Sequence, residues 1–467
     1  MSNKNQQAIV LGGSISGLLT ARVLADHFAR VIVIERDLLP TDHSFRKGAP
    51  QARHLHVLLA RGEQIMTKLL PGLGDRLDQA GAPTFDLGEE AFAAIGGKVV
   101  AMQTSGVLSR SISRVRLEAE VRSMVKQIAN IEFREQTEVL RLLGNYDQSK
   151  VVGVAVRQRG SGHGVQEISA DFVVDATGRR SKAPIWLEKM GYAQPEETII
   201  NATVGYATRV FQPRDGFNPD WRVVAIPPEY PYKTRGGGIQ RQEDGTVIMT
   251  LLGTAGDLPP TDEASFIEFA GDVHPIFVET LNQCDPITSI VGYRKLENQW
   301  RRFDKLERMP DRFAVIGDAF CAFNPIYGQG MSAAAMEAVQ LGDFLTKAQG
   351  DLDGVAQRFI RSMPSVVSSA WMLATGEDLR WPTTTGEPDS FMVRMAPWLS
   401  AKIQLSLPYS PEVFQAFVEV QNLLKGSERF FRPWTFAAIL WHSWRAQRQA
   451  QHHTAQHRAR REETRFA

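Results

Sequence analysis

The sequence has few cysteines and almost no net charge. Only Cys284 and Cys321 occur among 467 residues, which excludes a disulfide framework and a paired-cysteine metal motif. The formal net charge is +1, from 53 basic and 52 acidic residues. A general nucleic-acid binder normally has a basic surface, so we expect no nucleic-acid partner and favour small-molecule chemistry.

The start of the chain has no long apolar segment. Residues 1–7 are polar and lead directly into a strand pattern, whereas a secretory signal would contain ~7–15 apolar residues. On this ground we expect a cytoplasmic protein. No internal repeat is present, and ~100–200 residues per domain predicts two or three domains.

Motifs for several other chemistries are missing. The sequence has no GxSxG motif for a nucleophilic serine, and the glycines at 96–97 lack the rest of a phosphate loop. His453 and His457 have helical i, i+4 spacing, but no third ligand is near them in a polar and basic tail. We therefore expect no metal site.

Strand and helix patterns alternate along most of the chain. Residues 8–11 and the segment VIVIERD predict strands on either side of a glycine turn and a helix. A helix is predicted from Arg114 to Ile128, followed by strands in EVLRLL, KVVGVAVRQ and ADFVVDATGRRS. Between about 199 and 293, alternating strands with one helical insert predict an antiparallel sheet. After residue 350 the pattern is helical.

The first glycine turn matches a dinucleotide-binding fingerprint. It consists of Gly12, Gly13, Ser14, Ile15, Ser16 and Gly17, and Glu35 and Arg36 follow the second strand. Glycines let the backbone approach a pyrophosphate, whose charge is met by the helix N-terminus. Ser14 replaces the usual middle glycine, and its hydroxyl can donate to phosphate. Glu35 predicts a free ribose 2′-hydroxyl, as in FAD or NAD, because a carboxylate repels a 2′-phosphate.

A second glycine-rich turn lies far along the chain. The segment GDAFCAFNPIYGQGMSAAAMEA follows a predicted strand at 313–316 and precedes a predicted helix at about 332–347. Asp318 stands at the end of that strand. A second acidic anchor some 280 positions after Glu35 fits a ligand long enough to reach both.

Residues 9–37, 171–181 and 313–338 resemble the three fingerprints of the class A FAD-dependent monooxygenases, which have the p-hydroxybenzoate hydroxylase fold. With the strand pattern, this resemblance implies an α/β protein in three parts. These are a Rossmann-like FAD-binding domain, an inserted antiparallel-sheet substrate domain and a helical C-terminal region. Their predicted bounds are 1–84, 105–198 and 294–350 for the first, 85–104 and 199–293 for the second, and 351–467 for the third.

The resemblance also implies roles for individual residues. Asp318 would bind the ribityl chain of FAD, and the loop 324–331 would wrap the flavin ring. Within that loop, Pro325 stiffens the backbone, Gly328 and Gly330 allow close approach, and Met331 begins the next helix.

Three arginines are further candidates for the cofactor site. Arg114 matches the helix arginine that meets the FAD pyrophosphate in this family, and its alternative is a solvated arginine at a helix start. Arg46 and Arg53 belong to a basic segment after the ribose-binding strand. They either reach the FAD and the active site or only cap local structure.

The implied function is an FAD-dependent monooxygenase that hydroxylates or epoxidises an apolar small molecule with molecular oxygen, through a hydroperoxide at flavin C4a. NADPH or NADH would reduce the flavin. Thr177-Gly178 stands where many members have Asp-Gly, so a separate flavin reductase is an alternative donor. RKGAPQARHLH and FNPIYGQGM resemble most the branch of polyether and squalene-type epoxidases, which suggests an alkene substrate and secondary metabolism.

No acid-base pair can be assigned, so the catalytic residues stay unknown. Tyr206, Trp221, Tyr230 and Tyr232 are candidates for the substrate face of the sheet. Two alternative functions stay open: a non-redox cyclase of a polyene with structural FAD, and a non-enzymatic flavin-binding scaffold. The tryptophan-rich signature of flavin halogenases is missing.

The C-terminal segment predicts an aromatic helix from Phe430 to Trp444. Phe430, Trp434, Ala437, Trp441 and Trp444 would lie near one face, followed by arginines at 445 and 448. Packing across the two domains is the simpler interpretation. The alternative is an interfacial membrane anchor, since aromatic rings beside basic residues suit a headgroup boundary. About 15 residues are too few to span a bilayer.

Overall fold

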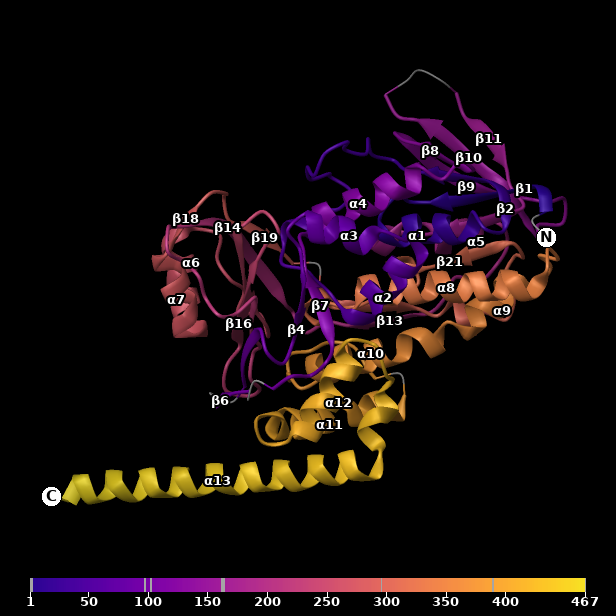
Figure 1. Cartoon of the computed structure of the whole chain (residues 1–467). Coiled ribbons are helices and arrows are strands. Elements are labelled where there is room, and N and C mark those ends of the chain that lie inside the picture. Colours follow the sequence, from indigo (N-terminus) through magenta and orange to yellow (C-terminus); the bar gives the residue numbers. More distant parts are fainter. Residues whose placement is uncertain are drawn as a thin grey trace.

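The computed structural model describes residues 3–95, 98–100, 103–160, 164–294, 296–388 and 390–466. Two large sheets and a group of C-terminal helices make up most of it (Figure 1). The mixed α/β fold class is confirmed, with a parallel Rossmann-like sheet, antiparallel sheets and a helical C-terminal region.

The first large sheet is parallel and five-stranded, in the order β21-β12-β1-β2-β8. Its apolar strands are buried on both faces, as in a sheet covered by helices on either side. Helix α1 packs against both α4 and α8. The bounds are β1 Asn3–Leu11, β2 Phe28–Ile34, β8 Ile131–Arg134, β12 Phe172–Asp175, β21 Phe313–Val315, α1 Ile15–Leu24, α4 Arg114–Lys126 and α8 Gly330–Ala348.

The second large sheet has eight strands, in the order β18-β14-β17-β16-β15-β5-β6, with β19 paired to β14. Its pairs are antiparallel except for β15 with β5. Helix α6 packs on it at β16 and against α7. The bounds are β5 Ala91–Ile95, β6 Lys98–Val99, β14 Gly205–Pro213, β15 Val223–Ile226, β16 Arg235–Arg241, β17 Val247–Gly253, β18 Cys284–Pro286, β19 Val291–Tyr293, α6 Glu263–Val273 and α7 Pro275–Asn282.

Strand β16 has three consecutive glycines and was not predicted. A Cβ at Gly237 would lie 2.8 Å from Cε1 of Phe277 on α7, and a Cβ at Gly236 would lie 2.6 Å from the Ile226 carbonyl oxygen. Glycine weakens a strand in general, but it is found where another element approaches closely. The approach of Phe277 on α7 therefore explains Gly237, and the neighbouring strand β15 explains Gly236.

Three smaller sheets have the strand orders β11-β10-β9, β13-β20-β22 and β3-β7-β4. The predicted pair at 138–143 and 150–158 is the antiparallel pair β9 and β10. Residues Ile199 and Ile200 pair with β20, not with the eight-stranded sheet. The remaining bounds up to residue 330 are β3 Val57–Leu58, β4 Thr84–Asp86, β7 Leu108–Ser111, β9 Thr137–Gly144, β10 Val151–Gln158, β11 Gln166–Ser169, β13 Glu197–Ile200, β20 Asn298–Arg301, β22 Cys321–Ala322, α2 Ala60–Leu69, α3 Leu73–Gln79 and α5 Ala183–Lys189.

After residue 350 the described chain is helical, as predicted. The last helix begins at Pro433, so Phe430 lies in the preceding 3₁₀ turn and is fully buried there. Figure 1 shows α13 extending past the rest of the molecule. Among the described residues, no helix is both long and apolar enough to cross a membrane. The bounds are α9 Val355–Ser362, α10 Pro364–Asp378, α11 Phe391–Ser406, α12 Pro411–Gln421 and α13 Pro433–Phe466.

Candidate functional site

A cavity of about 940 Å³ is lined by residues of both large sheets and of the C-terminal helices. One part of its wall comes from the turn between β1 and α1, and another from the loop before α8. A third part comes from β15, β17, α11 and α12. The cavity is large enough for a cofactor and lies next to two helix N-termini.

The first of these N-termini belongs to α1. Gly12 has φ +102°, and a Cβ there would lie 2.6 Å from the Ala176 carbonyl oxygen, while a Cβ at Gly17 would lie 1.8 Å from the Gly12 carbonyl oxygen. Ser14 is the N-cap residue, yet its side chain does not cap the helix. The first backbone N–H groups of α1 therefore keep their capacity to bind an anion.

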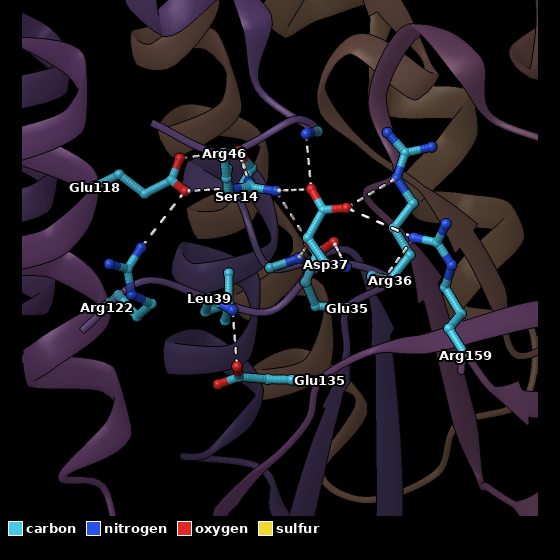
Figure 2. Close-up of polar contacts among 12 residues, drawn as sticks. Ser14, Glu35, Arg36, Asp37, Leu39, Arg46, Glu118, Arg122, Glu135 and Arg159 are labelled. Atoms are coloured by element: carbon cyan, nitrogen blue, oxygen red, sulfur yellow. Dashed lines mark hydrogen bonds and ion pairs between the residues drawn. The ribbon is translucent and has the colours of Figure 1, made fainter. Parts of the chain in front are cut away.

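The Ser14 hydroxyl lies at the centre of a charged cluster (Figure 2). It accepts from Arg46 Nη2 at 2.8 Å and from Arg114 Nη2 at 3.4 Å, and it donates to Glu118 Oε2 at 3.0 Å. Both guanidinium groups belong to residues that line the cavity. Two cations next to a helix N-terminus form a site for an anionic group such as a pyrophosphate.

Glu118 holds the two arginines in place. Its carboxylate lies 2.8 Å from Arg114 Nη1 and 3.0 Å from Arg46 Nε, and its side chain is buried. Burial raises the pKa of Glu118, but the charges of Arg114 and Arg46 outweigh this and leave the pKa below its ordinary value. The sequence contained a signal for Glu118 in its i, i+4 spacing from Arg114, but we did not predict its role.

Glu35 closes the other side of this cluster. Its Oε2 accepts from the backbone N–H of Gly13 at 2.8 Å, its Oε1 accepts from that of Asp37 at 2.9 Å, and Arg46 Nη1 lies 3.5 Å away. Figure 2 shows the carboxylate of Asp37 across Arg46 from that of Glu118, and Arg46 Nη1 lies 3.4 Å from Asp37 Oδ2. The Glu35 carboxylate borders the cavity, where its remaining lone pairs can accept from a ribose hydroxyl.

The second N-terminus belongs to α8. Gly317 and Gly328 have φ +65° and +68°, conformations that glycine adopts without strain. Asp318 borders the cavity with 43% of its side chain exposed, and Arg179 Nε lies 3.9 Å from its Oδ2. Helix α8 has no side-chain cap and no acidic residue in its first turn, so its positive end also faces the cavity.

Arg179 was not predicted as a site residue, although it lies in the middle fingerprint. Its guanidinium donates to the Phe323 and Glu297 carbonyl oxygens at 2.5 and 2.6 Å. In the same turn, buried Asp175 accepts from the Thr177 backbone and hydroxyl at 2.9 and 2.6 Å. This turn therefore connects the end of β12 to the start of the loop before α8.

A buried carboxylate of α10 holds the loop before α8. Asp378 accepts from Asn298 Nδ2 at 2.7 Å, from Asn324 Nδ2 at 3.1 Å and from the Tyr327 hydroxyl at 3.1 Å. Burial raises the pKa of Asp378 to about 7, against the effect of these hydrogen bonds. Sequence reasoning missed Asp378, because nothing in a helix pattern indicates a partner 54 residues earlier.

The far part of the cavity is mainly apolar. It is lined by residues of the eight-stranded sheet and of α11 and α12, including Val224, Ile226, Leu252, Ile403, Leu407, Phe414, Phe417 and Val418. Tyr206 also lines it, as predicted for the substrate face. The other three aromatic candidates do not: Trp221 belongs to the sheet core, Tyr230 packs edge-on against Trp381, and Tyr232 is exposed.

Most of the predicted cofactor residues meet at this one cavity. The lining set contains Gly12, Ser14, Ser16, Glu35, Arg36, Arg46, Arg114, Asp318, Pro325, Gly328, Gly330 and Met331. Gly13 and Gly17 are not in that set but shape the turn behind it. Arg53 is outside it as well, because its exposed guanidinium lies over the Phe45 ring, 4.4 Å from the centroid. His453 and His457 lie outside the residues whose side chains are described.

These residues fit FAD. The turn at Gly12 leaves no room for a side chain, the cluster around Ser14 offers two cations, and two uncapped helix N-termini face the same cavity. The pyrophosphate of such a dinucleotide would lie at the N-terminus of α1, and its electron-rich flavin ring would lie at the N-terminus of α8.

Comparison with known proteins identifies the family and the fold. A family model described as "FAD binding domain" matches residues 5–351. "Protein Rv3254" of Mycobacterium tuberculosis is 33% identical over 402 residues, which cover 83% of each chain. Among solved structures, flavin-dependent brominase Bmp2 has a TM-score of 0.66 at 12% identity, covering 96% of this chain and 99% of its own. PqsL of Pseudomonas aeruginosa, described as a probable FAD-dependent monooxygenase, has a TM-score of 0.60 at 17% identity, covering 81% and 98%.

Proposed function

Since this chain belongs to the FAD binding domain family and is an FAD-dependent oxidoreductase, we propose that it inserts one atom of molecular oxygen into an apolar small molecule, by hydroxylation or epoxidation. The observation that carries this proposal is the single cavity that joins two helix N-termini to an apolar end. If the cofactor binds at the two helix N-termini, the apolar end of the cavity remains free for a substrate. The resemblance to epoxidases supports an alkene substrate from secondary metabolism.

In this proposal, residues near the two N-termini hold the cofactor. Arg46, Arg114 and Ser14 bind the pyrophosphate, and Glu35 accepts from the adenosine ribose. Asp318 accepts from the ribityl chain, and the backbone at 328–331 faces the flavin ring. FAD bound in this way would supply oxygen activation after its reduction by NADPH, NADH or a separate flavin reductase.

The remaining residues shape the place where the substrate lies. Apolar side chains such as Ile226, Leu252 and Ile403 exclude water and hold an apolar substrate by burial of its surface. Asp378 acts through Asn324 and Tyr327, whose positions set the conformation of the loop before α8. It is therefore a positioning residue.

The test is the visible spectrum of the FAD-loaded protein during anaerobic titration with NADPH and then NADH, with and without apolar alkenes. Bleaching of the flavin band, recovery on adding oxygen, and an oxygenated product would support the proposal. If the flavin band bleaches only after a flavin reductase is added, the oxygenation proposal stands and the reductase is the electron donor. If neither donor nor a reductase bleaches the bound flavin, oxygenation is excluded, and the cyclase and scaffold alternatives are then tested with a polyene substrate.

A further inference from the structure

The C-terminal helix α13 exposes the aromatic side chains that were predicted to pack. Trp434, Trp441 and Trp444 are 85%, 58% and 44% exposed. The opposite face is buried, through Thr435, Ile439 and Ser443 at i, i+4 and i+8. Domain packing therefore uses the small and aliphatic residues of α13, and the tryptophans have no such role.

Helix α11, which packs against α13, has a similar exposed stripe. Phe391, Met395, Trp398 and Leu405 follow one another at intervals of four, three and seven residues and are each more than one third exposed. The Ser406 hydroxyl donates to the Ile439 carbonyl oxygen at 3.0 Å, and Lys402 Nζ donates to Gln447 Oε1 at 3.2 Å. The two stripes thus border the same contact, and we call them together the aromatic surface.

The charges in the two segments that contain these stripes have one sign. Residues 390–411 contain Arg394 and Lys402, residues 432–449 contain Arg432, Arg445 and Arg448, and neither segment contains Asp or Glu. Arg448 lies over the Trp444 ring, 4.1 Å from its centroid. Aromatic rings beside cations, with no acidic residue, match the boundary between headgroups and acyl chains of an anionic bilayer. Two copies of this surface facing each other would bring like charges together.

The position of α11 connects this surface to the cavity. Ser400, Ile403, Gln404 and Leu407 line the cavity, while the exposed stripe lies on the same helix. One helix therefore separates the apolar end of the cavity from the aromatic surface. A substrate dissolved in a membrane would reach the cavity over a short path.

We propose that the aromatic surface of α11 and α13 binds the interface of a membrane that contains anionic lipids. Binding is peripheral, since no described helix can span a bilayer. Burial of the rings and attraction between arginines and lipid headgroups both contribute to it. Membrane binding is tested separately from the proposed oxygenation, because it is measured without substrate or electron donor.

The test is flotation of the full-length FAD-loaded protein with vesicles of phosphatidylcholine alone and vesicles that also contain phosphatidylglycerol. We expect the protein to float with the anionic vesicles and to be released by high salt. The double variant Trp441→Ala/Trp444→Ala should bind at least about tenfold more weakly, because two rings no longer insert. Arg445→Glu/Arg448→Glu should lose binding to anionic vesicles.

Matched controls come from exposed residues elsewhere. Tyr146→Ala in the β9–β10 turn and Arg361→Glu on α9 remove an exposed ring and an exposed cation far from this surface in sequence, and they should bind as the unchanged protein does. Absence of flotation with both kinds of vesicle would overturn the proposal, as would equal flotation of the tryptophan variant. A dimer in solution that dissociates in the tryptophan variant, without vesicle binding, would show instead that this surface joins two copies of the chain.

Discussion

The two ends of the cavity are built in different ways. At the α1 end, Arg46, Arg114, Glu118 and Glu35 form a buried network of ion pairs around Ser14. At the other end, aliphatic and aromatic side chains of β15, β17, α11 and α12 face each other with few charges. Buried charges tolerate little change because each depends on its partners, whereas apolar walls can change size and keep their function. We therefore expect substitutions at the cofactor end to be poorly tolerated, whereas substitutions at the substrate end should change which substrates fit.

The largest effect is expected from Arg114→Ala, which leaves Glu118 buried with one strong partner fewer. We predict a loss of about 3–5 kcal/mol in the free energy of unfolding and much weaker FAD retention. Denaturant unfolding and the FAD content after gel filtration measure both. Arg116→Ala removes a more exposed arginine of the same helix and should cost less than about 1 kcal/mol. Equal effects of the two variants would contradict the role of the network.

Gly12→Ala tests the turn at the same end. Its Cβ would lie 2.6 Å from the Ala176 carbonyl oxygen at φ +102°, so we expect a loss of about 1–3 kcal/mol and reduced FAD content. Gly160→Ala has a similar positive φ of +72° but open space around the new Cβ. The FAD content of this control should match that of the unchanged protein. Full FAD content in Gly12→Ala would show that the pyrophosphate does not approach this turn.

Ile403→Phe tests the apolar end. The larger ring takes space from the substrate, so turnover should fall by about 10-fold or more, while FAD content and reduction of the flavin stay unchanged. Ile185→Phe on α5, where the side chain is half exposed, is the matched control and should leave turnover unchanged. Loss of FAD in Ile403→Phe would mean that the two ends of the cavity are not separate.

A pH dependence is expected at Asp378, between the two ends. Burial raises the pKa of its carboxyl to about 7 in the folded protein, against about 4 in the unfolded chain. The folded state binds the proton more tightly, so this group's contribution to the free energy of unfolding falls as the pH rises from about 4 to about 7. The stability difference between the unchanged protein and Asp378→Asn should shrink or reverse over this range, on the order of 1–4 kcal/mol. Urea unfolding of both proteins at several pH values tests this, and a difference independent of pH would contradict it.

The α1 end could be predicted from sequence because its signals are local. Gly12, Ser14 and Gly17 lie within six residues, and Glu35 follows at the end of the next strand. Strand, turn and helix bring these residues together by backbone geometry alone. The same holds for Asp318 and the glycines before α8.

The substrate end could not be predicted in this way, because it is assembled from strands and helices far apart in the chain. No strand was predicted at the three glycines of β16, and the approach of Phe277 on α7 explains Gly237 there. The periodicity of the C-terminal aromatic residues predicted a packed face, but the core uses the opposite face of α13. Periodicity identifies a stripe and leaves open whether the core or another partner covers it.

The most direct test of this cofactor site is a crystal structure of the protein with FAD bound. We expect electron density for the pyrophosphate beside Ser14, Arg46 and Arg114, and for the flavin ring against residues 328–331. The apolar end formed by Leu252, Ile403 and Leu407 should stay open for substrate. Density for the pyrophosphate elsewhere, or a flavin ring that fills the apolar end, would contradict this cofactor site.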